Sequence, residues 1–221
     1  MMEVQAMSEL IKRSYLCEVR TDTDEKHGNI IVGRPIVYNS STDIGGMFEE
    51  VIERGALDKT DLTDVRFLVN HDVSKIPLAR SRKNTENSTM QLIPDDDGLG
   101  IRVDLDIENN TEARNLYSAI QRGDISGMSF MFGLKDGDDE WEDLDSDYPK
   151  RHIKSISTVV EVSAVTFPAY SATSISARDK SALDNARLAL DNARSKGPVD
   201  TGKDQKAIEL LKLKNKILGG V

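Results

Sequence analysis

The chain has 221 residues, of which 38% are hydrophobic, 5% aromatic and 30% charged, and its formal net charge is -9. This length is enough for one domain with a buried core, and the many charged residues indicate solvated segments outside it. The negative charge argues against nucleic acid or an anionic membrane as the partner, and the lone Cys17 cannot form an intramolecular disulfide.

The first third of the chain is predicted to be mostly β-structure. Two runs rich in β-branched residues, "SYLCEVR" and "NIIVGRPIVYN", read as strands separated by the polar turn "TDTDEKHG". No apolar run has the length of a signal peptide or a membrane span, so we expect a soluble, intracellular protein. The single cysteine predicts a reducing compartment. The segment "MFEEVIERGAL" predicts a short amphipathic helix that ends near Gly55.

The strand "DVRFLVNHD" follows, and its alternation predicts one face shared by Val65, Phe67, Val69 and His71. Next comes "TMQLIPDDDGLGIRVDLDI", which predicts a hairpin with its loop from Pro94 to Gly98. These elements continue the β-rich pattern.

The middle of the chain combines a helix with two apolar strands. "TEARNLYSAIQRGD" predicts a helix with Thr111 as N-cap and a stop at Gly123. In "GMSFMFGL" the large apolar residues alternate, so Ser129 lies on the opposite face. An acidic stretch separates this strand from the long β run "HIKSISTVVEVSAVTFPAY". Many short strands with two helices predict a strand-rich α+β fold, either a small β-barrel or a sheet with helical cover.

A separate arm is predicted from Arg178 to Val221. It contains ten Lys and Arg residues against six Asp and Glu residues, has no aromatic residue, and repeats "ALDNAR" after seven residues. Such a segment can be helical but buries little surface. We therefore divide the chain into a core, residues 1–177, and a helical or disordered C-terminal arm, residues 178–221.

Three residues form a candidate catalytic set. A serine hydroxyl such as that of Ser129 needs a neighbouring base before it becomes a good nucleophile. His71 lies at the end of an apolar strand face. Glu161 is predicted to share a mostly apolar strand face with Val159, Ser163, Val165 and Phe167, where a carboxylate needs a cationic or hydrogen-bonding partner. Together they supply a nucleophile, a base and a group that orients the base. The alternatives are an ordinary strand serine, a core histidine, and a carboxylate paired with Arg or Lys.

Other known sites fit the sequence less well. The residues around Ser129 read "GMSFM", so the G-x-S-x-G elbow of many hydrolases is missing. "DLDSD" begins like a calcium loop, but Tyr148 and Lys154 occupy the positions that need glycine and glutamate. No zinc spacing, Walker loop or dinucleotide fingerprint is present, so we predict neither a metal nor a cofactor.

The order of four motifs resembles a known family. "FLVNHD", then "PLAR", then "RGDISGMSFMF" and finally "VVEVSAVTFPAY" are similar to the prohead serine proteases of tailed bacteriophages, which are distantly similar in fold to herpesvirus assemblin. The resemblance covers roughly Gly33 to Thr173 and leaves out the arm. It implies a small β-barrel with surrounding helices, Ser129 as nucleophile and His71 as general base. Glu161 is implied as the third member, with His152 as a rival because assemblin uses a histidine there.

The resemblance also implies a biological role. The protein would be a serine endopeptidase in the host cytoplasm, inside the immature capsid (the prohead), where it removes the scaffolding portion of the major capsid protein and cleaves itself. A homodimer is a further expectation, and no nucleic-acid or membrane partner is expected. The alternatives are a non-enzymatic scaffold or assembly factor on a protease-like fold and an unrelated serine hydrolase, which the missing elbow disfavours.

Overall fold

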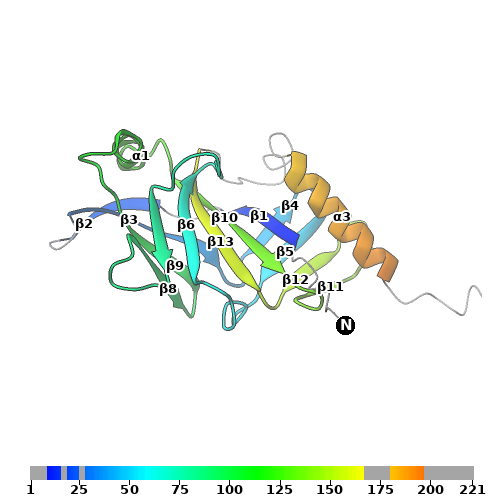
Figure 1. The fold of residues 1–221 in the computed structure, drawn as a ribbon. Coiled ribbons are helices and arrows are strands. Elements are labelled where there is room, and N and C mark those ends of the chain that lie inside the picture. The colour runs from blue at the N-terminus through cyan, green and yellow to red at the C-terminus, as the bar shows by residue number, and fades with distance from the viewer. Residues whose placement is uncertain (1–8, 16–18, 25–27, 167–179, 197–221) are drawn as a thin grey trace, which may run out of the picture.

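The computed structural model describes residues 9–15, 19–24, 28–166 and 180–196 (Figure 1). Cys17, the end of the predicted β run at Pro168 and the arm beyond residue 196 lie outside these ranges. The strands of the first half are β1 (Glu9–Tyr15), β2 (Val19–Asp24), β3 (Gly28–Val37), β4 (Ser41–Ile44), β5 (Phe48–Ile52), β6 (Asp64–Val69), β7 (Ala79–Arg82), β8 (Met90–Asp95) and β9 (Gly98–Asp104). The remaining elements are α1 (Thr111–Gln121), β10 (Gly127–Leu134), β11 (Asp139–Glu142), β12 (Lys150–Ile153), β13 (Thr158–Val165) and α3 (Lys180–Lys196).

The described strands form three sheets. A five-stranded sheet has the order β1-β10-β13-β6-β7, and two four-stranded sheets have the orders β11-β12-β5-β4 and β2-β3-β9-β8. The strand-rich α+β prediction is therefore confirmed. The predicted closed barrel does not form among these strands, because the first and last strand of each sheet pair on one side only.

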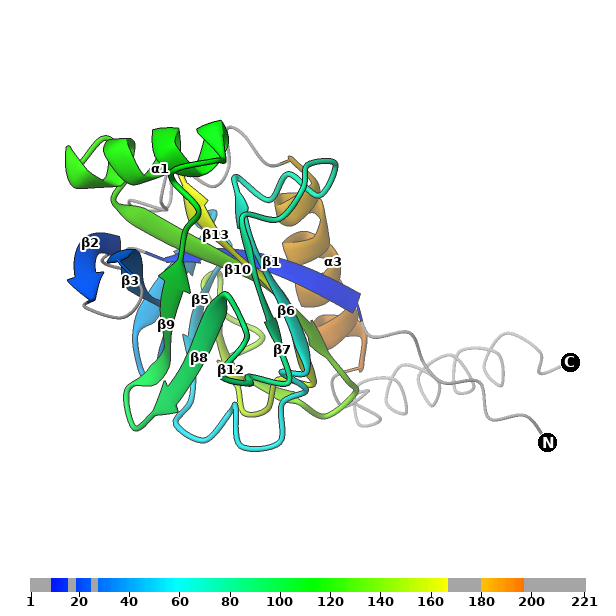
Figure 2. The same ribbon diagram turned by 60° about the vertical axis from the view of Figure 1, so that its left-hand side comes forward.

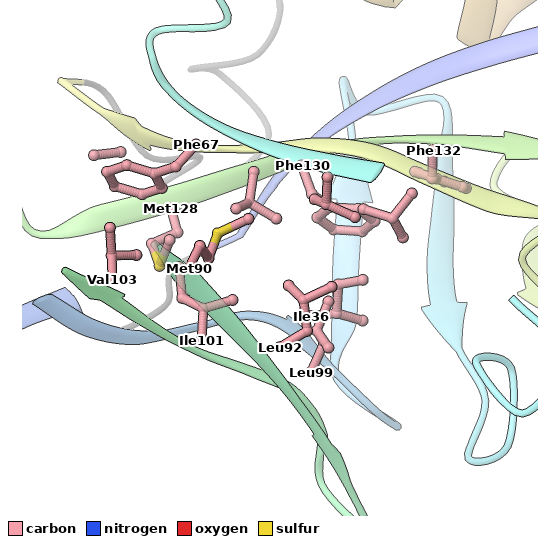
Figure 3. Packing of buried hydrophobic residues seen from close by; sticks show 14 of the residues in the cluster. Ile36, Phe67, Met90, Leu92, Leu99, Ile101, Val103, Met128, Phe130 and Phe132 are labelled. Atoms are coloured by element: carbon pink, nitrogen blue, oxygen red, sulfur yellow. The ribbon is translucent and has the colours of Figure 1, made fainter. Parts of the chain in front are cut away.

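The core lies between the five-stranded sheet and the sheet of β8, β9 and β3. Figure 3 shows Phe67, Met128 and Phe130 directed from the first sheet toward Met90 and Ile101 on the second. The predicted alternation of β10 is confirmed, since Met128, Phe130, Phe132 and Leu134 all belong to this core cluster. Because these side chains fill one face of β10, the other face is left for Ser129.

Two predictions of secondary structure were wrong, one for the segment of β5 and one for the run that contains β12 and β13. The segment predicted as an amphipathic helix contains strand β5, which pairs antiparallel with β4 and parallel with β12. Its apolar spacing fits a helix, but these non-local pairings override that local pattern. The run predicted as one long strand is divided into β12 and β13 by the segment 154–157, and each half joins a different sheet.

The hairpin and helix predictions in the middle of the chain are confirmed with changes at their ends. Strands β8 and β9 form the hairpin, but Pro94 and Asp95 pair with Leu99 and Gly98, so the loop is shorter than predicted. Helix α1 is capped by Asn110 rather than Thr111, because the Asn110 carboxamide oxygen accepts the backbone N–H of Glu112 and Ala113. The changed ends of the hairpin loop and of helix α1 do not alter which side chains form the core.

The two described helices lie at opposite ends of the five-stranded sheet (Figures 1 and 2). Helix α1 packs into the main core through Ala113, Leu116 and Ile120. Helix α3, which begins the predicted arm, buries Ala186 and Leu190 against Ile44 and Phe48. Neither helix is long and apolar enough to cross a membrane. The division of the chain at residue 177 stays a prediction, since residues 167–179 lie outside the described ranges.

Candidate active site

Ser129 lies in the middle of β10, between its two neighbours in the five-stranded sheet. It pairs with Ser163 of β13 on one side and with Ser14 of β1 on the other. The residue is completely buried. The serine predicted as a nucleophile is therefore held in a rigid central strand, which fixes the direction of its hydroxyl.

His71 reaches the same face of the sheet from a turn rather than from a strand. Strand β6 ends at Val69, and both Asn70 (φ 53°) and His71 (φ 58°) adopt the left-handed backbone conformation. The predicted alternation through His71 was therefore wrong, because the chain leaves the pleat after Val69. Two consecutive non-glycine residues at positive φ are uncommon and often mark a functional turn.

The turn is fixed to the neighbouring strand by several hydrogen bonds. The Asn70 amide N–H donates to the Ala164 carbonyl (3.0 Å), and its carboxamide exchanges hydrogen bonds with Thr166 (2.9 and 3.0 Å). The His71 amide N–H donates to the Ser163 hydroxyl (3.1 Å). These contacts hold the imidazole over β13 and β10.

Glu161 reaches this face because β13 contains a β-bulge. Phe132 pairs with Val159 and Met131 pairs with Glu161, so Val160 is an extra residue in the strand. Without it, the two-residue period would place Val159 and Glu161 on the same face, as the sequence analysis predicted. The bulge corrects that prediction. It leaves Val159 in the core and turns Glu161 to the side of Ser129.

The three predicted residues meet in a linear arrangement. His71 Nδ1 lies 2.5 Å from Glu161 Oε1, and His71 Nε2 lies 2.6 Å from Ser129 Oγ. The His71 side chain is 12% exposed, and that of Glu161 is 1% exposed. The buried carboxylate therefore accepts a hydrogen bond from one imidazole nitrogen, while the other nitrogen faces the serine hydroxyl.

Ser163 is a further member of the site that the sequence analysis did not select. Its hydroxyl donates to Glu161 Oε2 (2.6 Å) and accepts the His71 amide N–H (3.1 Å). Both oxygens of the buried carboxylate thus have partners, as a buried charge requires. The available signal was the spacing of "EVS", which places Glu161 and Ser163 two residues apart on one strand face.

His152, the rival for the third position, lies on another sheet. It belongs to β12, and its Nδ1 and Nε2 contact Glu53 (2.9 Å) and Glu142 (3.2 Å). Glu161 rather than His152 is therefore the residue beside His71. In the described part of the chain, no group of three His, Cys, Asp or Glu side chains is placed to hold a metal ion.

An apolar cavity of about 380 Å³ adjoins the turn that carries His71. Leu68, Ile76, Leu116 and Ile125 contribute to its wall, between the segment after β6 and helix α1. An ion pair between Lys75 and Glu112 (2.8 Å) connects the two sides. An apolar side chain of a ligand could occupy this space next to the site.

Arg13, whose backbone carbonyl oxygen contacts the Ser129 hydroxyl, forms a buried ion pair with Glu50 that the sequence analysis also missed. The Arg13 guanidinium binds both carboxylate oxygens of Glu50, with an Nη2–Oε2 distance of 2.9 Å. Arg151 contacts the same carboxylate at 3.3 Å. Burial alone would raise the pKa of Glu50, but the two guanidinium groups outweigh burial and hold it below its ordinary value.

Comparison with known proteins shows the family to which the chain belongs. No curated protein and no solved structure matches the chain. A family model described as caudovirus prohead serine protease matches residues 17–187. That region includes the turn at His71, the strand of Ser129 and the bulged strand of Glu161, and it covers most of the 221 residues. The chain therefore belongs to the caudovirus prohead serine protease family.

Proposed function

We propose that the protein is a serine endopeptidase in which Ser129 is the nucleophile, His71 the general base and Glu161 the group that orients His71. The observation that carries this proposal is the line of two short contacts, from Glu161 to His71 and from His71 to Ser129. Nucleophile, base and orienting acid in this order are the requirement for acyl transfer by a serine hydroxyl.

The geometry supports the following reaction. The Ser129 oxygen attacks the carbonyl carbon of a peptide bond while its proton passes to His71 Nε2. His71 then gives this proton to the amine, which leaves as the C–N bond breaks. Water, activated by the same nitrogen, hydrolyses the acyl-enzyme and restores the serine. Glu161 stabilises the imidazolium in both steps because its carboxylate lies beside Nδ1.

The proposed substrate follows from the family. Prohead proteases act on capsid protein, so we assign as substrate the scaffolding portion of the major capsid protein, together with the protease itself. The enzyme would work in the host cytoplasm, inside the prohead. The chemistry above uses only side chains of this chain, and the proposal includes no cofactor. A homodimer remains a prediction.

One observation favours the alternative role of a non-enzymatic assembly factor. Ser129 has no exposed surface, so a substrate cannot reach it in the structure as described. A protein that kept this conformation would join the shell without cutting anything.

Co-expression with the capsid precursor separates the two roles. Wild type, Ser129→Ala and the control Ser126→Ala, an exposed serine in the preceding loop, are compared by intact mass of the precursor. We expect trimming by wild type and by Ser126→Ala and none by Ser129→Ala. Trimming by Ser129→Ala would show that another residue is the nucleophile. An uncut precursor in all three samples, with the protein present in the shell, would support the assembly-factor role.

A further inference from the structure

Strand β1 covers the nucleophile. It is the edge strand of the five-stranded sheet and pairs antiparallel with β10, with Ser14 opposite Ser129. The Ser129 hydroxyl lies 2.7 Å from the backbone carbonyl oxygen of Arg13. With β1 in this place Ser129 is completely buried.

The Arg13 carbonyl competes with His71 for one proton. A serine hydroxyl has a single hydrogen to donate, and Ser129 Oγ has two acceptors in reach, His71 Nε2 at 2.6 Å and Arg13 O at 2.7 Å. A hydroxyl that donates to the carbonyl is not available for transfer to His71. The pairing with β1 thus holds the site in a resting arrangement.

The position of β1 is also that of a bound peptide. Extended peptides commonly bind proteins by adding a strand to a sheet edge, where backbone hydrogen bonds supply affinity and side-chain pockets supply specificity. If β1 withdraws, the edge of β10 is open to such a peptide, with one peptide carbonyl next to Ser129. β1 also precedes residue 17, where the family match begins, whereas the three site residues lie inside the match.

The side chain of Arg13 shows what the neighbouring pocket accepts. It is 4% exposed and runs to Glu50, which is completely buried. The guanidinium makes two hydrogen bonds to the two carboxylate oxygens, a geometry that suits arginine better than lysine.

The charges around this pocket remain unbalanced without Arg13. Arg151 contacts both Glu50 (3.3 Å) and Asp139 (2.7 Å), so one cation then faces two carboxylates. A pocket with one uncompensated negative charge attracts a basic side chain and rejects an acidic one.

We propose that β1 occupies the substrate cleft and that Glu50 selects peptides with a basic residue, arginine above lysine, at the position whose carbonyl faces Ser129. This inference rests on the proposed function. It adds the class of peptide that the enzyme cuts and identifies β1 as a strand that must withdraw before a substrate binds.

Labelling of Ser129 in the full-length chain tests the inference. Two peptidyl phosphonate probes that differ only in an arginine or a leucine next to the phosphorus are compared, and intact mass gives the labelling rates. We expect the arginine probe to react at least tenfold faster with wild type. Arg13→Ala should react faster still with this probe, because the anchoring side chain has left the pocket.

Glu50→Gln should abolish the preference for arginine, while Glu49→Gln, on the same strand with its carboxylate bound to Lys150, should keep it. Circular dichroism establishes whether Glu50→Gln folds. If this variant does not fold, the ratio of the labelling rates of the arginine and leucine probes on wild type tests the preference for arginine.

The outcomes distinguish this inference from the proposed function. Equal rates for the two probes, with Ser129 labelled by a small fluorophosphonate, would overturn the inference and leave the serine protease intact. Absence of labelling by the fluorophosphonate in wild type and in Arg13→Ala would instead contradict the proposed function.

Discussion

At the scale of single residues, Ser163 connects Glu161, on its own strand, to the turn that carries His71. Its hydroxyl contacts the Glu161 carboxylate and the backbone of His71 at the same time. Since this hydroxyl binds both Glu161 and the backbone of His71, its role is to position these two residues.

We predict that Ser163→Ala lowers kcat about tenfold and leaves KM unchanged, because a buried carboxylate oxygen and a backbone N–H lose a partner worth about 1–3 kcal/mol. Steady-state kinetics on a peptide substrate provide the measurement. The matched control is Ser81→Ala, since the Ser81 hydroxyl is also buried but has no hydrogen-bond partner among the described residues. Equal kinetics for the two variants would contradict the positioning role.

The sequence predicted Ser129, His71 and Glu161, but the local reasons given for two of them were wrong. His71 is not on the strand face, because the backbone turns to positive φ at Asn70, and no residue type there forces that turn. Glu161 does not share a face with Val159, because a bulge at Val160 depends on pairing with β10, which is distant in sequence. The motifs selected three side chains that the fold brings together, and tertiary pairing explains how they meet.

At the scale of elements, the hairpin of β8 and β9 depends on the close approach of Gly98 to β3. Gly98 has φ 139°, and a Cβ atom there would lie 2.0 Å from the Ile36 carbonyl oxygen. Backbone cannot move aside as a flexible side chain can, so only glycine fits at this position.

We expect Gly98→Ala to lower the free energy of unfolding by about 3 kcal/mol, the upper range for overpacking in a tight site. Urea denaturation followed by circular dichroism measures it. Gly137→Ala is the control, because Gly137 also has positive φ (88°) but nothing lies within 4 Å of its added Cβ. Gly137→Ala should lower the free energy of unfolding by about 1 kcal/mol, the cost of placing a non-glycine residue in the left-handed conformation. Similar losses for the two variants would show that the contact with Ile36 is unimportant.

The side-chain faces of β10 were predictable from its alternation, whereas β5 was mistaken for a helix. In β10 the large apolar residues that pack in the core alternate with Gly127, Ser129, Met131 and Gly133, as the sequence predicted. In β5 the consecutive residues Glu50, Val51 and Ile52 are all buried, so both faces of the strand are covered and the apolar residues do not alternate. The spacing of apolar residues in this segment fits a helix as well as a strand. Only the pairing with β4 and β12 makes it a strand.

At the scale of the whole molecule, helix α3 binds the folded body although it begins the predicted arm. Leu190 is 6% exposed in a small second cluster with Ile44, Phe48 and Ala186. The Arg194 guanidinium also donates to the Leu144 and Ser146 carbonyl oxygens (3.1 and 2.9 Å).

Replacement of Leu190 by alanine should lower the free energy of unfolding by about 2 kcal/mol, the lower range for a buried leucine in a small cluster. Leu188→Ala, on the same helix but 52% exposed, should cost less than about 0.5 kcal/mol. Thermal unfolding of the full chain compares the two. If Leu190→Ala melts at the temperature of Leu188→Ala, the helix does not contribute to the stability of the body.

The Arg13–Glu50 pair connects β1 to the sheet of β5 and predicts a pH dependence of stability. The pKa of Glu50 is lower in the folded chain than its ordinary value of 4.5. The ionised Glu50 carboxylate therefore contributes its full stabilisation of the fold above pH 4.5. This stabilisation is lost as the pH falls through the lowered pKa.

Urea unfolding of wild type and Glu50→Gln at several pH values tests this prediction. Wild type should be more stable by about 3 kcal/mol at pH 7, the cost of removing the buried carboxylate that two guanidinium groups share. The difference should shrink as the pH falls below about 4.5. A difference that is constant from pH 7 to pH 3 would show that the ionised carboxylate is not the source of the stability.

The topology of the five-stranded sheet has a consequence for the time at which the enzyme becomes able to cut. His71 is separated by 58 residues from Ser129 and by 90 residues from Glu161, and β1 must find a partner 116 residues away. Contacts of such long range form late in folding, after the intervening chain has been made. During synthesis, a ribosome-bound chain that has not yet reached β13 has no active site. Under the proposed function, newly made capsid subunits nearby are therefore not cut until folding is finished.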